Sequence, residues 1–169
     1  MLAPLDILVL LKISVKGSRP WVQRDIANEL HVSQASVHRA LQSAAEVGLY
    51  SAQRKRIVVP RLEEALVHGA KYFLPPKRGG ETRGMPTSWA APPLCEQLAA
   101  GNETIPVWPD PEGVVRGITF EPLHEGVPAA AREDPQLYEL LALVDALRDG
   151  RPREIRLAEK ELHKRLLLA

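Results

Sequence analysis

The chain has 169 residues, of which 45% are apolar and 25% charged, the composition of an ordinary globular protein. No stretch approaches the ~18 consecutive apolar residues of a membrane span. The first residues lack the basic region and the cleavage site of a signal peptide, so we expect a cytoplasmic protein that does not contact a membrane. The single cysteine, Cys95, excludes an intrachain disulfide.

The net charge of +1 conceals an uneven distribution along the chain. Residues 1–84 carry 13 lysines and arginines against 7 acidic residues, whereas residues 85–169 carry 9 against 14. Such a split indicates that the basic half faces a polyanion and the acidic half faces something else. The alternative is a chance asymmetry.

Apolar periodicity predicts three helices at the start of the chain. The first covers Leu5–Val15, the second Gln23–Leu30 and the third Ser33–Val47. Ser33 stands where an N-cap belongs, because its hydroxyl can accept a free backbone N–H of the first turn. Gly48 is in the usual position to terminate the third helix.

Two short strands and a fourth helix are expected next. The strands fall within Leu49–Val59, on either side of the basic tip Gln53–Arg56, and the helix covers Leu62–Tyr72. We assign residues 1–73 to one domain on this basis.

The remaining residues divide into an irregular part and a helical part. Residues 74–134 contain most of the prolines and no sustained period, so we predict an irregular segment in which Val114–Phe120 is a candidate strand. Helical periodicity returns at Pro135 and again over Ile155–Leu168, which predicts a helical hairpin in residues 135–169. Its apolar seam either mediates dimerisation or covers the core within one chain.

Residues 24–41, RDIANELHVSQASVHRAL, resemble the helix-turn-helix of bacterial winged-helix regulators of the MarR, GntR and IclR-like groups. The following Val47–Tyr50 resembles the entry into their wing, and the resemblance covers residues 4–72. It implies a fold that is mainly α with a small β-wing. The expected organisation is a winged helix-turn-helix DNA-binding domain in residues 1–73, an irregular middle and a C-terminal helical hairpin.

The third helix of such a unit enters the major groove, and its polar face would read bases. Arg39 suits guanine, while Gln34 or Gln42 suits adenine. Ser33, Ser36 and the helix N-terminus suit phosphate oxygens. The expected DNA contacts, including the basic wing, are Ser33, Gln34, Ser36, His38, Arg39, Gln42, Arg54, Lys55 and Arg56.

Other features receive plainer interpretations. No two histidines have metal-ligand spacing, and no acid, base or nucleophile set emerges, so we expect no metal, no cofactor and no enzyme. Cys95 is interpreted as a semi-buried structural thiol. Lys77–Gly84 lacks the order of a phosphate loop and is interpreted as a basic arm beside the wing or as a solvated or packed loop. Glu139, Asp145 and Asp149 are assigned to the solvent face of their helix.

The expected function is a sequence-specific regulator of transcription, acting as a repressor, that binds double-stranded DNA as a homodimer on two half-sites. The C-terminal part, Ala131–Arg148 with the helix to Leu168, is similar to winged-helix proteins encoded beside nucleotidyltransferase-type toxins. This similarity implies an antitoxin-like or autoregulatory role. The alternative is a protein-binding module whose acidic half contacts a toxin or a polymerase subunit.

Overall fold

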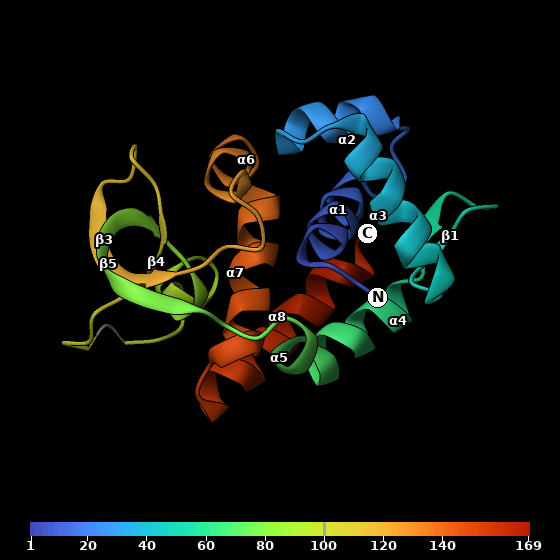
Figure 1. The fold of residues 1–169 in the computed structure, drawn as a ribbon. Coiled ribbons are helices and arrows are strands. Elements are labelled where there is room, and N and C mark those ends of the chain that lie inside the picture. Colours follow the sequence, from blue (N-terminus) through green and yellow to red (C-terminus); the bar gives the residue numbers. More distant parts are fainter. Residues whose placement is uncertain (100) are drawn as a thin grey trace.

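The computed structural model describes residues 1–99 and 101–169, and most of them are helical. Figure 1 shows three regions: a small sheet at one end, the helix α7 in the middle, and the N-terminal helices at the other end. The expectation of a mainly α chain with a small β part is confirmed at this level.

The N-terminal helices lie close to their predicted positions. They are α1 (Pro4–Lys16), α2 (Gln23–Leu30) and α3 (Gln34–Glu46). Nearly every apolar side chain of α1 is buried, because α2, α3 and α7 pack against it. Ser33 is the N-cap of α3, as predicted, and its hydroxyl accepts the N–H of Ser36 at 3.1 Å. Gly48 follows α3 with φ of 76°, in the left-handed region that favours glycine.

A short antiparallel hairpin and a further helical stretch follow α3. Strands β1 (Tyr50–Ser51) and β2 (Arg56–Ile57) confirm the two predicted strands. The helical stretch consists of α4 (Val59–Glu64), a π-helical turn over Ala65–Gly69 and α5 (Ala70–Phe73). It begins earlier than the predicted Leu62, since Pro60 suits the first turn of a helix.

Residues 74–134 are not irregular, and this prediction was wrong. Strands β3 (Arg78–Pro86), β4 (Pro106–Pro109) and β5 (Val115–Phe120) form a small closed sheet. Strand β3 pairs antiparallel with both others, whereas β4 and β5 are parallel. A helix, α6 (Val127–Glu133), follows the sheet. The expected strand at Val114–Phe120 is confirmed as β5.

Two glycines mark close approach between the backbones of these strands. A Cβ atom at Gly84 would lie 2.0 Å from the carbonyl oxygen of Trp108, and one at Gly117 would lie 2.2 Å from that of Ile105. Glycine is needed because the backbones approach closely at both points. In β3 and β4, glycines and prolines remove the alternation of apolar residues that normally marks a strand, so these two strands were not predicted, unlike β5.

The C-terminal hairpin is present as α7 (Pro135–Asp149) and α8 (Pro152–Leu167). Helix α7 is buried on all sides from Leu140 to Arg148, because α1, α5, α6 and α8 surround it. Its apolar seam is therefore covered within one chain, which was the second of the two alternatives for this element.

A buried polar cluster joins α7 to the sheet. The side chain of Asp145 is 1% exposed and accepts hydrogen bonds from Thr87 Oγ1 at 2.7 Å and Trp108 Nε1 at 2.8 Å. Its other oxygen pairs with Arg148 Nη1 at 2.8 Å, and the Nε of Arg148 donates to the carbonyl oxygen of Leu74 at 2.7 Å. Burial raises the pKa of Asp145, while these donors act in the opposite direction.

The assignment of Asp145 to the solvent face was therefore wrong. The sheet that covers this side of α7 was not predicted, and a polar side chain there would be solvated without it. Glu139 and Asp149 are half-buried and are paired, Glu139 with Arg165 and Asp149 with Arg78.

A second buried charge links α1 to α2 and α6. Lys12 is 4% exposed, and its Nζ lies 2.7 Å from Glu29 Oε2 and 2.6 Å from Asp134 Oδ2. Lys16 pairs with the other oxygen of Glu29 at 2.6 Å. Partial burial raises the pKa of Glu29, but the hydrogen bonds from the two lysines outweigh it, so this pKa lies below its ordinary value.

Because of this network, the free energy of unfolding should depend on pH. A carboxyl group with a lowered pKa in the folded state stabilises the fold above its ordinary pKa, and this contribution is lost as the pH falls through the folded-state value. We expect Glu29→Gln to remove up to about 1 kcal/mol of unfolding free energy at neutral pH, since the pair is partly exposed. The loss should be smaller at about pH 3. Urea unfolding at both pH values measures it. Glu64→Gln, an exposed carboxylate without an ion pair among the described residues, is the control; an equal loss in both variants contradicts the assignment.

Candidate nucleic-acid interface

Helix α3 has one buried face and one polar outward face. Val37, Ala40, Leu41 and Ala44 are buried against the neighbouring helices. The outward face of α3 consists of the exposed residues Gln34, His38, Arg39 and Gln42. Helical spacing brings them to one side because residues three or four apart are neighbours on a helix surface.

A row of hydrogen bonds runs along the first turns of α3. The hydroxyl oxygens of Ser33 and Ser36 lie 2.8 Å apart, and Arg39 Nη2 donates to Ser36 Oγ at 3.2 Å. This bond holds the guanidinium near the N-terminal half of the helix and leaves its other N–H groups for an external acceptor. Glu46 is also exposed, so the C-terminal end of α3 is acidic rather than basic.

The β1–β2 hairpin presents a second set of cations. Arg54, Lys55 and Arg56, which we call the hairpin tip, are all exposed. The turn is held by Ser51 Oγ, which accepts the N–H of Arg54 at 3.3 Å, and Lys55 has a positive φ of 50°. At the base of the hairpin, Tyr50 packs against Trp21 with ring centroids 6.5 Å apart.

These cations differ from most others in the chain because they lack carboxylate partners. Within residues 1–99 and 101–169, no ion pair involves Arg39 or the hairpin tip. A surface that keeps its cations unneutralised suits a polyanion.

Sequence reasoning missed a further cation beside the hairpin. Arg19 lines a hollow of about 440 Å³ together with Trp21, Gln23, Lys55 and Arg56. Its Nε donates to the carbonyl oxygen of Lys16 at 3.0 Å and its Nη2 to that of Val15 at 2.8 Å. The side chain is thus held in place by its own helix end. No signal in the sequence places Arg19 beside a hairpin more than thirty residues away.

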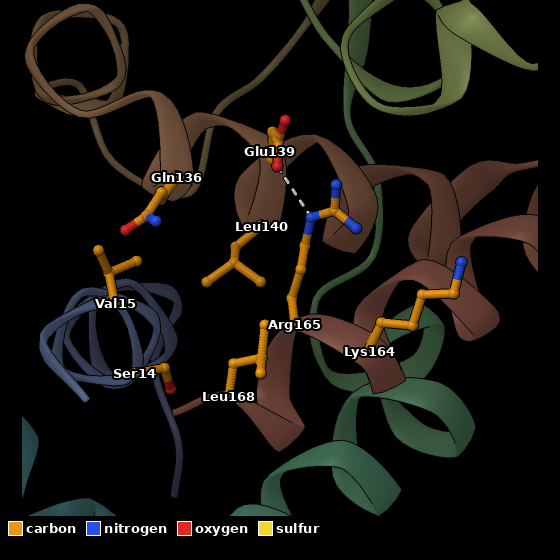
Figure 2. A pocket seen from close by; sticks show the side chains of 8 residues that line it. All are labelled: Ser14, Val15, Gln136, Glu139, Leu140, Lys164, Arg165 and Leu168. Carbon is orange, nitrogen blue, oxygen red and sulfur yellow. Dashed lines mark hydrogen bonds and ion pairs between the residues drawn. The ribbon is translucent and has the colours of Figure 1, made fainter. Parts of the chain in front are cut away.

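A second hollow, of about 390 Å³, lies between α1, α7 and α8. Figure 2 shows that the guanidinium of Arg165, which lines this hollow, points to Glu139. Arg165 Nε and Glu139 Oε2 are 2.9 Å apart. Arg165 also pairs with Glu161 at 2.6 Å, so its charge is neutralised internally. This hollow therefore offers a weaker anion site than the surface formed by α3 and the hairpin tip.

The remaining candidate sites give little support to other chemistry. No group of three or more His, Cys, Asp or Glu side chains suited to a metal ion is found in the described part of the chain. Cys95 is exposed, so the expectation of a semi-buried thiol was wrong. Lys77–Gly84 lies largely in β3, at the opposite end of the molecule from α3 (Figure 1). None of the described helices has the length and apolar character needed to cross a membrane.

No protein-family model, no curated protein and no solved structure matches the chain. The surface formed by α3 and the hairpin tip is therefore the feature of the molecule that indicates a function.

Proposed function

We propose that the chain is a sequence-specific DNA-binding protein of the winged helix-turn-helix type that represses transcription in the cytoplasm. In this proposal α2 and α3 are the helix-turn-helix and the β1–β2 hairpin is the wing. The observation that carries it is the polar outward face of α3 beside an exposed hairpin tip whose three cations have no carboxylate partner among the described residues.

Each part of this surface has a defined task. The major groove of B-DNA is about 12 Å wide and admits a helix, so the outward face of α3 would meet base edges. Arg39 can donate two hydrogen bonds to guanine, and Gln42 can pair with adenine. Ser33 and the first N–H groups of α3 would bind phosphate oxygens. The hairpin tip and Arg19 would bind the sugar–phosphate backbone, which supplies affinity without sequence preference.

Repression would follow from occupation of an operator. Operators commonly contain two half-sites, which two copies of one chain can bind with matching symmetry. The leucines of α7 are buried within one chain, so a homodimer would use another surface. Leu167 and Leu168, both exposed at the end of α8, are candidates for that contact.

Salt dependence of duplex binding tests the proposal. Binding of a labelled random duplex and of genomic fragments would be measured by fluorescence anisotropy at several salt concentrations. The triple variant Arg54→Ala, Lys55→Ala and Arg56→Ala should reduce the slope of log K against log salt by about 2–3, since each phosphate contact contributes about 0.9.

The control removes the same charge elsewhere. The triple variant Lys77→Ala, Arg83→Ala and Arg116→Ala, which we call the sheet control, replaces three exposed cations on or next to the sheet. It should leave the slope unchanged. Absence of salt-sensitive duplex binding in the parent chain would refute the proposal.

The alternative, a module that binds a protein through its acidic half, has less support. Many carboxylates of this half are already paired inside the chain: Asp110 with Arg132, Asp134 with Lys12 and Asp145 with Arg148. Fewer of them remain available for a basic partner than the sequence suggests. Tight capture of a purified toxin-like protein in the absence of DNA would favour this alternative.

A further inference from the structure

Helix α8 has a cationic face that the proposed function does not use. Arg153, Arg156 and Lys160 are its only exposed side chains from residue 153 to residue 160. They occupy positions i, i+3 and i+7, which places them on one side of the helix. The three cations span about 10 Å of helix axis at 1.5 Å per residue.

These three differ from every other lysine and arginine after residue 85. Arg116, Arg132, Arg148, Arg151, Lys164 and Arg165 all pair with carboxylates. Arg153, Arg156 and Lys160 form no ion pair with any residue that the structure describes. Two acidic side chains of α8 already have partners within the chain. Glu161 is buried and forms an ion pair with Arg165, and Glu154 accepts a hydrogen bond from the backbone N–H of Arg151. Glu159, half-buried at the edge of this face, adds negative charge nearby, and Glu103 and Glu154 line a hollow together with Arg153.

The C-terminal end of α8 reaches the base of the hairpin. Ala169 lines a hollow of about 110 Å³ together with Lys55 and Arg56, and a Cβ atom at Gly17 would lie 3.8 Å from the carbonyl oxygen of Leu168. From this point the cationic face lies roughly 14 to 24 Å along the helix axis. This separation is less than one turn of duplex, about 34 Å, so a duplex that runs from the hairpin tip along α8 would meet both sets of cations.

The chemistry of the face favours phosphate over other partners. A helix that lies on a membrane needs an exposed apolar face, whereas Ala158, Leu162 and Leu166 of α8 are buried inside the protein. A protein interface usually centres on apolar or aromatic anchors; α8 itself exposes none between Arg153 and Lys160, and the partly exposed Trp89 and Leu98 line a hollow at one end of the face only, beside Arg153. A duplex carries one negative charge per about 1.7 Å of its axis, so one helix face can contact several phosphates.

We propose that Arg153, Arg156 and Lys160 bind the phosphate backbone of duplex DNA that flanks the segment contacted by α3 and the hairpin. The inference rests on the proposed duplex binding and enlarges its footprint. The acidic second half of the chain then contributes to DNA binding through a local basic surface, although its net charge is negative.

The test compares two duplex lengths and two triple variants. In the variant Arg153→Ala, Arg156→Ala and Lys160→Ala, the slope of log K against log salt should fall by about 2–3 on a duplex of roughly 40 base pairs. A duplex of roughly 8 base pairs is about 27 Å long, too short to cover α3, the hairpin tip and the far end of the α8 face together, so the slope on it should fall less. The sheet control carries the same change in net charge and should match the parent chain on both lengths. Equal thermal unfolding midpoints would show that the variants remain folded.

Each other outcome has a distinct meaning. An unchanged slope on the long duplex overturns this inference, and an equal fall on both lengths also contradicts flanking contact. Loss of binding to vesicles containing anionic lipid, with DNA binding intact, would assign the face to a membrane surface and overturn the inference. If the hairpin-tip variant reduces the slope and the α8 variant does not, the proposed function stands without this extension. The reverse result would instead reject the proposed α3–hairpin interface.

Discussion

Replacement of Arg39 by alanine is expected to lower the affinity for the preferred duplex by about five- to 150-fold. The guanidinium is exposed on the outward face of α3 and is held toward the N-terminal half of the helix by its bond to Ser36. A bidentate contact to guanine is worth about 1–3 kcal/mol of discrimination, which corresponds to this range. The preferred duplex would first be selected from a random library, and its affinity for both chains would then be measured by anisotropy.

The pattern of the loss distinguishes a base contact from a phosphate contact. The variant should lose preference at one base pair and retain its binding to random duplexes to a larger extent. Arg83→Ala removes an exposed arginine at the sheet end of the molecule and serves as the matched control. An unchanged preferred sequence together with unchanged affinity in Arg39→Ala would exclude Arg39 as a base-reading residue.

Replacement of Asp145 by alanine is expected to lower the free energy of unfolding by about 3–5 kcal/mol. The change leaves Arg148 buried without its carboxylate and removes the acceptor of both Thr87 and Trp108. A loss of this size is a large fraction of the 5–15 kcal/mol typical of a folded domain. Urea unfolding followed by circular dichroism measures it.

Two milder variants test whether burial and pairing cause the effect. Thr87→Val removes one neutral donor from the cluster and should cost about 1 kcal/mol. Asp149→Ala breaks the more exposed pair with Arg78 and should cost less than about 1 kcal/mol. If Asp145→Ala unfolds within about 1 kcal/mol of the parent chain, the cluster does not hold α7 to the sheet in the way described.

Most residues of the candidate site lie within two short segments of the sequence, so their exposure could be predicted from local pattern. The outward face of α3 follows from the positions of Val37 and Leu41, because a helix that buries these two must expose Gln34, His38, Arg39 and Gln42. The hairpin tip is a cluster of adjacent cations between two short apolar segments. Arg19 could not be chosen, since its proximity to Lys55 and Arg56 depends on how the chain folds back.

The charge split of the sequence describes the exposed charges of the first half better than those of the second. It located the unneutralised cations of α3 and the hairpin in the basic half. It also suggested that the acidic half presents negative charge, whereas the structure pairs many of those carboxylates internally and leaves Arg153, Arg156 and Lys160 exposed. Net charge over a segment does not show which charges are neutralised, because pairing depends on side chains far apart in sequence.

The sequence by itself determined the helices α1, α2, α3, α7 and α8 and the β1–β2 hairpin. Their signals are apolar periods, an N-cap such as Ser33 and a terminating glycine such as Gly48, all of which act within a few residues. Only the tertiary structure decided the sheet of β3, β4 and β5, the burial of Asp145 and the enclosure of α7. Each of these depends on contacts between segments separated by tens of residues, where close backbone approach at Gly84 and pairing of buried charges matter more than local pattern.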